Sequence, residues 1–215
     1  MAGLETIALI PESTRKVKGG EPGTAALDGF GDALPRNERA KLLALHEEIA
    51  SKTAQDIDPG GLLPAYRRFD GNMYRRIPAD AWEGRLPSVE VLIVSGLRGI
   101  VASRDTIPRY RHSMAESSEG FGKLNRWWHD HGLAETLAAY LNAVRPKTVV
   151  DLLSLEYREA VAGYPDRLTG IPVKAIDFPG MGRASQPRRG EIVATILRTG
   201  EPLGGDLSPV RDGMR

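Results

Sequence analysis

The sequence predicts a mixed α/β fold, a single compact domain in which a central sheet is surrounded by helices. Short apolar runs of strand type alternate along the chain with segments whose apolar residues recur at helical spacing. No linker-like stretch separates one group of elements from another. We therefore expect one domain over residues 1–199, followed by a flexible tail over residues 200–215 that contains Gly and Pro.

Several segments have the composition of β-strands. Residues 5–11 alternate weakly and stop at a proline, whereas residues 89–94 (VEVLIV) form a continuous apolar run typical of a buried strand. Residues 147–153 and 171–178 contain further β-branched clusters. Residues 107–114 are expected to be extended as well.

Helical patterns fill much of the remaining chain. Within residues 36–54, Leu42 and Ile49 belong to an apolar stripe that also includes His46, which predicts a core histidine rather than a ligand or a base. Pro187 is expected to begin the last helix, because proline suits the first helical position. The other expected helices are residues 62–76 with a break at positions 70–71, 121–129, 133–144 and 154–163.

The segment after the first strand is a candidate ligand-binding loop. It is rich in glycine and begins with the polar residues Ser13, Thr14, Arg15, Lys16 and Lys18. Loops at the carboxyl ends of strands bind ligands in open α/β sheets, and lysine with exposed backbone N–H groups suits phosphate. A polar, flexible loop without a ligand is the alternative.

Charge and composition limit the classes of function. The net charge is +1, from 29 basic and 28 acidic residues, so nucleic-acid binding would depend on local clusters of arginine and lysine. All apolar runs are far shorter than a membrane span, and we expect no membrane association. The N-terminus lacks a basic region before its apolar stretch, so we expect no signal peptide and a cytoplasmic location.

The motifs of common cofactor and metal sites are absent from the sequence. It contains no cysteine and no GxGxxG, P-loop, GxSxG or HExxH pattern. His129 and His131 are two residues apart, so a helix would direct them to different sides, and no third metal ligand is evident. We therefore expect neither a metal site nor a cofactor.

Five short segments share their order and their residues with one known family. The first is LIPESTRK, in which Ser13 and Lys16 fall on polar positions of the family pattern. The others are FDGNMY (69–74), SGLRGIVASRDTIPRYR (95–111), WWHD (127–130) and DLLSLEY (151–157). Together these segments resemble the YaaA family of bacterial peroxide-stress proteins.

The resemblance implies a compact α/β domain with a basic cleft, DNA binding, and a role in limiting oxidative damage to DNA and free intracellular iron. It also implies an element similar to the helix-hairpin-helix of DNA glycosylases. The family carries a lysine shortly before an Arg-Gly pair. Here Arg189 and Gly190 are present, but Gln186 and Pro187 occupy the lysine positions, as in a short, divergent member.

Two functions are compatible with these residues. In the first, the basic cleft binds nucleic acid or a nucleotide-like anion as part of oxidative-stress protection. In the second, the same cleft belongs to an enzyme that acts on a nucleotide, a nucleobase or another anionic metabolite. The sequence leaves the oligomeric state open.

The candidate site residues come from the segments that share the family pattern. Lys16 and Asp105 are the catalytic candidates, since Asp105 is by residue type the best general base. The alternative for Asp105 is an ion pair or a turn cap with Arg104 or Arg111. Arg111 is the arginine expected to point inward. The expected ligand-binding residues are Ser13, Tyr110, Arg111, Ser154, Tyr157 and Arg189.

Overall fold

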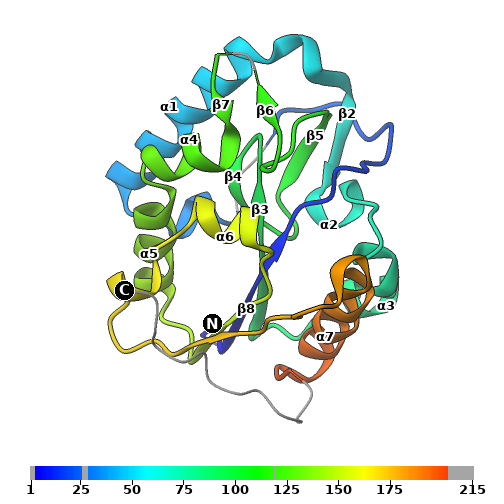
Figure 1. Ribbon diagram of the computed structural model, residues 1–215, viewed down its shortest axis with the longest axis vertical. Helices are drawn as coiled ribbons and strands as arrows, with labels where there is room; N and C mark the ends of the chain where they lie inside the picture. The colour runs from blue at the N-terminus through cyan, green and yellow to red at the C-terminus, as the bar shows by residue number, and fades with distance from the viewer. Residues whose placement is uncertain (1–2, 26–28, 119, 203–215) are drawn as a thin grey trace.

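The computed structural model describes residues 3–25, 29–118 and 120–202, and the structural statements below concern these residues. The centre of the fold is a five-stranded sheet in the order β4, β3, β1, β8, β9 (Figure 1). In that order the strands span Gly99–Ala102, Val89–Ser95, Thr6–Pro11, Thr148–Asp151 and Val173–Ala175. The mixed α/β class predicted from the sequence is therefore confirmed.

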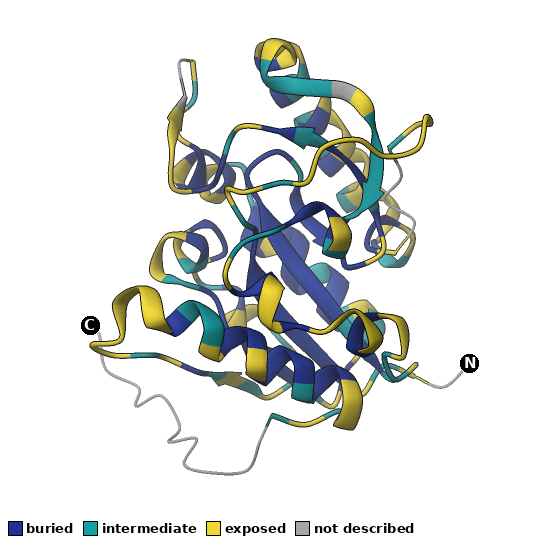
Figure 2. Cartoon of the chain, turned by 90° about the vertical axis from the view of Figure 1, so that its right-hand side faces the viewer, coloured by how far each residue is buried: buried dark blue, intermediate teal, exposed yellow. Residues whose placement is uncertain are grey.

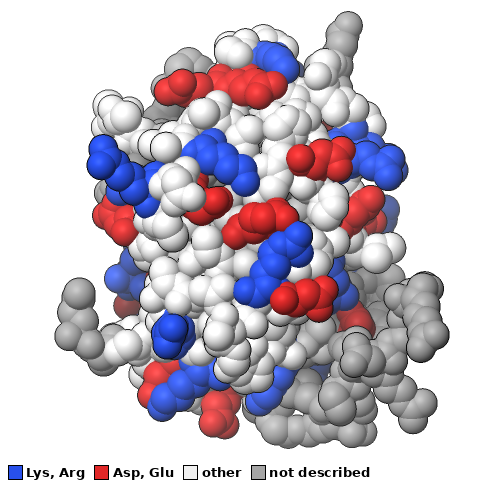
Figure 3. Space-filling view, turned by 90° about the vertical axis from the view of Figure 1, so that its left-hand side faces the viewer, with Lys and Arg blue, Asp and Glu red and all other residues white. Residues whose placement is uncertain are grey.

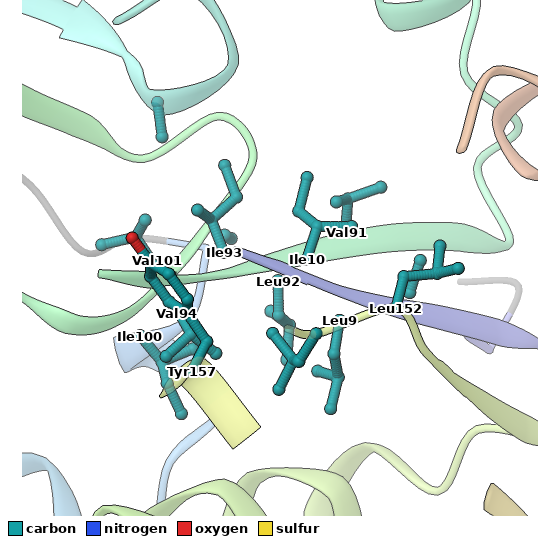
Figure 4. Close-up of a cluster of buried hydrophobic side chains, with 14 of the residues drawn as sticks. Leu9, Ile10, Val91, Leu92, Ile93, Val94, Ile100, Val101, Leu152 and Tyr157 are labelled. Carbon is teal, nitrogen blue, oxygen red and sulfur yellow. The ribbon is translucent and has the colours of Figure 1, made fainter. Parts of the chain in front are cut away.

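Strand β1 is the middle strand and is parallel to both neighbours. Leu9 lies opposite Leu92 of β3 on one side and opposite Asp151 of β8 on the other. Every residue of β1 is buried, because both faces of the sheet are covered. Figure 4 shows the side chains of neighbouring β1 residues, such as Leu9 and Ile10, pointing to opposite faces of the sheet.

The order of the strands creates a switch point between β1 and β8. From β1 the chain moves to β3 and β4 on one side of the sheet, and it later returns to place β8 on the other side. Connections that leave in opposite directions open a crevice at the carboxyl ends of the two strands, and open α/β sheets bind ligands there.

Helices cover both faces of the sheet (Figure 1). Helix α5 contacts β4 and α1 on one side, whereas α7 contacts β1 and β3 on the other. Figure 2 shows buried and exposed residues alternating along α7, as expected of an amphipathic helix on a sheet. The helices are α1 (Arg36–Lys52), α2 (Ala65–Arg68), α3 (Ala79–Glu83), α4 (Leu124–Asp130), α5 (Leu133–Val144), α6 (Leu155–Ala160) and α7 (Ser185–Thr199).

Smaller elements complete the described chain. Strands β2 (Ile57–Pro64) and β5 (Thr106–Tyr110) form an antiparallel pair, and β6 (Ser117–Ser118) pairs with β7 (Gly122–Lys123). The 3-10 helices are η1 (Gly31–Ala33), η2 (Ala54–Asp56), η3 (Tyr74–Arg76), η4 (Pro165–Arg167) and η5 (Gly182–Ala184). No helix of the described part is long and apolar enough to cross a membrane.

Most of the expected elements are confirmed, but several are shorter than expected. Strand β5 ends at Tyr110 rather than at residue 114, and α6 ends at Ala160 rather than at residue 163. Residues 62–64 belong to strand β2 rather than to a helix, because they pair with β5. Helix α4 starts at Leu124, since the two residues before it form β7. Pro187 is the third residue of α7 rather than the first. The expected tail lies almost wholly outside the described residues, which end at position 202.

His46 is the core histidine that the periodicity predicted. It is 5% exposed, and its Nε2 atom lies 2.8 Å from the carbonyl oxygen of Arg98. Burial lowers the pKa of His46 to about 3, so the imidazole is neutral at physiological pH. This histidine therefore holds the β3–β4 turn against α1.

Asp105 closes the turn before β5 and caps backbone groups. It is 3% exposed, and its carboxylate accepts hydrogen bonds from the backbone N–H groups of Gly29 at 2.7 Å, Ala102 at 2.8 Å and Phe30 at 3.3 Å. The cap alternative for this residue is confirmed in kind, although the donors are backbone groups rather than Arg104 or Arg111. Burial raises the pKa of Asp105 to about 6.

We expect Asp105→Asn to destabilise the protein, and to do so more strongly at low pH. The folded-state pKa of about 6 lies above the ordinary value of 3.8, so ionisation of the native carboxyl costs stability as the pH rises. Asparagine has no such cost. The difference in unfolding free energy between wild type and variant should therefore shrink by roughly 1–2 kcal/mol between about pH 5 and about pH 7.5. Urea denaturation at both pH values measures it, and a constant difference would contradict this account of Asp105.

Candidate functional site

A cavity opens at the carboxyl ends of β1 and β8, at the switch point of the sheet. Its volume is about 460 Å³. The walls come from the loop after β1, the segment before η3, the segment after β5, the start of α6 and the start of α7. The lining residues are Pro11, Glu12, Ser13, Thr14, Arg15, Gly71, Asn72, Met73, Tyr74, Ser113, Ala115, Ser154, Glu156, Tyr157 and Gln186.

Three of the residues proposed from the sequence meet in this cavity. Ser13 follows β1, whereas Ser154 and Tyr157 lie at the start of α6, directly after β8. They are far apart in the chain but adjacent in space, because β1 and β8 are paired strands. The other five candidates are not part of the cavity wall: Lys16, Asp105, Tyr110, Arg111 and Arg189.

A buried ion pair lies at the back of the cavity, with Glu12 in the wall and Lys16 behind it. The Nζ atom of Lys16 is 3.6 Å from Oε2 of Glu12, and the two side chains are only 1% and 0% exposed. The ammonium group also lies 4.1 Å from the centre of the Tyr110 ring. Burial lowers the pKa of Lys16, while the negative charge of Glu12 opposes that change. Lys16 is therefore enclosed by protein groups.

Glu12 is a residue that the sequence reasoning did not select. Its Oε1 accepts hydrogen bonds from the backbone N–H groups of Gly96 at 2.9 Å and Met114 at 3.1 Å. Its Oε2 accepts a hydrogen bond from the hydroxyl group of Tyr110, whose oxygen lies 2.7 Å from Oγ of Ser95. Burial raises the pKa of Glu12. An acidic residue directly after an apolar strand, in the pattern LIPES, was the available sequence signal.

The two arginines among the candidates have roles other than those expected. Arg111 is exposed, so the expectation that it points inward is wrong. Arg189 is buried, but its Nε atom donates to the carbonyl oxygen of Leu152 at 2.9 Å and it stacks on Phe178. Among the described arginines, Arg68 is fully buried, and it donates to backbone carbonyl groups. The buried guanidinium groups of Arg189 and Arg68 therefore have a structural role, since they join distant segments of the backbone by hydrogen bonds.

The cavity does not have the basic lining that the family resemblance implied. Its charged residues are one arginine, Arg15, and two glutamates, Glu12 and Glu156. The remaining polar groups are hydroxyl and amide side chains, which carry no charge. On the face of the molecule shown in Figure 3, basic and acidic side chains are also intermixed. Among the described residues, no three potential metal-ligating side chains gather in one place.

We expect Lys16→Met to lower the unfolding free energy by about 3–5 kcal/mol, because it leaves the Glu12 carboxylate buried without its cation. The double variant Lys16→Met with Glu12→Gln removes both charges and should recover part of that loss. Lys52→Met is the matched control, since Lys52 pairs with Glu48 on the surface at 2.7 Å and should cost less than about 1 kcal/mol. Urea denaturation measures these proteins together with the single variant Glu12→Gln. Losses of the two single variants that simply add in the double variant would contradict a coupled buried pair.

Comparison with known proteins identifies relatives of the chain. A UPF0246 protein from Francisella tularensis subsp. tularensis (strain WY96-3418) is 30% identical over 125 residues, which are 54% of this chain and 49% of the relative. The UPF0246 protein SCO2297 from Streptomyces coelicolor is 28% identical over 179 residues, 76% of this chain and 65% of the relative. The chain thus spans about half to two thirds of the length of these curated relatives.

A family model covers most of the described chain. The model for the family described as "Peroxide stress protein YaaA" matches residues 21–196, so the match begins after the loop that holds Ser13 and Lys16. The matched part includes the segments at positions 69–74, 95–111 and 151–157 on which the resemblance rested. The chain therefore belongs to the YaaA family of peroxide stress proteins.

Proposed function

We propose that the chain binds a small polar molecule, a nucleobase or a nucleoside, in the cavity at the carboxyl ends of β1 and β8 and acts on it as an enzyme. The observation that supports this most strongly is the cavity itself: it lies at the switch point of an open α/β sheet and is lined mainly by uncharged hydrogen-bonding side chains. Its volume of about 460 Å³ is in the range of small-molecule sites.

The lining suits a flat heterocycle with both donors and acceptors. The amides of Asn72 and Gln186 can donate and accept at the same time, as can the hydroxyl groups of Ser13 and Ser154. Tyr157 adds an aromatic surface. Bases present alternating donors and acceptors on their edges, which these side chains can match.

The charges favour a neutral ligand over a polyanion. Arg15 is the only cationic side chain among the lining residues, and Glu156 lies in the same wall. The ammonium group of Lys16 is occupied by Glu12 and the carbonyl oxygen of His112, so it does not supply a free positive charge. A triphosphate or a nucleic-acid backbone would meet little compensating charge here.

DNA binding and a cytoplasmic location remain predictions from the sequence. The relatives are longer than the region they share with this chain, so protection from peroxide by the whole protein is part of our proposal. In that proposal, the reaction takes place in the cavity, and its substrate is a free base or nucleoside rather than a nucleic-acid strand. Steeply salt-dependent binding of DNA would instead support the nucleic-acid function.

A ligand screen tests the proposal. Thermal-shift measurements with free nucleobases, nucleosides, nucleotides and a short DNA duplex should show stabilisation by a base or nucleoside that changes little between about 50 mM and about 200 mM salt. Stabilisation by DNA alone, falling steeply over the same salt range, would contradict the proposal.

The variant Asn72→Ala should weaken binding of the best ligand by about tenfold, because it removes an amide from the cavity wall. Asn37→Ala is the matched control, since Asn37 is exposed on α1 and is not part of the wall. Calorimetric titration of both variants gives the affinities. Equal affinities for wild type and Asn72→Ala would place the ligand elsewhere.

A further inference from the structure

The hydroxyl group of Ser113 is buried in the cavity wall without a hydrogen-bond partner. Ser113 is 1% exposed, and its Oγ atom makes no hydrogen bond of normal geometry with any described residue. A buried polar atom without a partner costs stability, and such atoms are rare in folded proteins. Those that persist need an explanation, and in the wall of a cavity a bound ligand can supply the missing partner.

The backbone on both sides of Ser113 is held in place by the buried ion pair. The Nζ atom of Lys16 donates to the carbonyl oxygen of His112 at 3.3 Å, and the N–H group of Met114 donates to Oε1 of Glu12 at 3.1 Å. The Cα of Gly96 packs so closely that an added Cβ would lie 2.9 Å from the Ser113 carbonyl carbon. The backbone of Ser113 is therefore fixed, which sets the place in the cavity wall from which its side chain extends.

Tyr157 is the neighbouring polar group in the same wall. It is 7% exposed and lines the cavity, and its side chain lies near that of Ser113 without a hydrogen bond of normal geometry between them. Burial raises the pKa of the Tyr157 hydroxyl, and nearby glutamates, Glu12 first among them, raise it further. The phenol therefore keeps its proton at physiological pH. A phenol is a better donor than acceptor, because its oxygen lone pair is delocalised into the ring.

We propose that the hydroxyl groups of Tyr157 and Ser113 together bind a carbonyl oxygen of the ligand, with Tyr157 as the principal donor. This assignment rests on the proposed function, and it narrows the ligand class to bases or nucleosides that carry a ring carbonyl group. Inosine and adenosine form a matched pair for this purpose, since they differ at the ring position that bears an oxygen in inosine and an amino group in adenosine. Inosine should bind about tenfold more tightly than adenosine.

The same proposal predicts that two substitutions weaken ligand binding without lowering the stability of the free protein. Ser113→Ala removes a buried hydroxyl group that has no partner, so the melting temperature of the free protein should stay the same or rise. Tyr157→Phe should likewise leave the fold stable, because it removes only the oxygen. Both variants should lose affinity for inosine by about tenfold. Tyr164→Phe is the matched control, since Tyr164 is buried but lies outside the cavity wall, and its affinity should be unchanged.

Differential scanning fluorimetry and calorimetric titration with inosine and adenosine separate the outcomes. Stable Ser113→Ala and Tyr157→Phe proteins with weakened inosine binding support the proposal. A clear fall in melting temperature for Ser113→Ala would show that the hydroxyl group is structural, and it would overturn the proposal whether or not a ligand binds. Inosine binding that is unaffected in both variants would overturn the hydroxyl pair alone. A wild-type protein that binds no base or nucleoside would overturn the proposed function and this ligand class with it.

Discussion

The buried ion pair between Glu12 and Lys16 organises the candidate site. One carboxylate at the end of β1 accepts hydrogen bonds from the segment after β3 at Gly96, from the segment after β5 at Met114, and from the side chain of Tyr110. The ammonium group of Lys16 donates a hydrogen bond to the carbonyl oxygen of His112, the residue before Ser113. Burying two charges is expensive, so the pair is maintained only while all of these contacts are made together. The walls of the cavity are therefore coupled to one another through β1.

Close backbone approaches reinforce this arrangement on the opposite wall. A Cβ on Gly71 would collide with Oγ of Ser13, and a Cβ on Gly190 would collide with the carbonyl oxygen of Met73. These two glycines allow the segment before η3 to lie against both the β1 loop and α7. The Arg-Gly pair at positions 189–190 therefore has a packing role. Arg189 donates a hydrogen bond to the chain after β8, and Gly190 leaves room for the backbone of Met73.

The arginine-rich segment at positions 95–111 shows why composition alone misleads about function. Arg111 was a candidate ligand-binding residue and Asp105 a candidate general base, yet Arg111 is exposed, and Asp105 serves as a backbone cap. What the segment contributes to the site is mostly hydrogen bonding behind the cavity, through Ser95, Gly96 and Tyr110. In this chain the residues of that segment thus form an internal network of contacts, which supports the cavity without forming its surface.

The sequence by itself determined the α/β class, the buried strands, helix α5 and the core position of His46, because periodicity and apolar runs report local burial. It also indicated the loop after β1 and the start of α6 as parts of a site. It did not reveal Glu12, the missing partner of Ser113, or which arginines are buried. Those depend on contacts between segments distant in the chain. The pairing of β1 with β3 and β8 places the carboxyl ends of these strands side by side and so brings Glu12 next to Gly96. The burial of Arg68 depends instead on its hydrogen bonds to the backbone of Val17 and Gly61, which only the folded chain brings together.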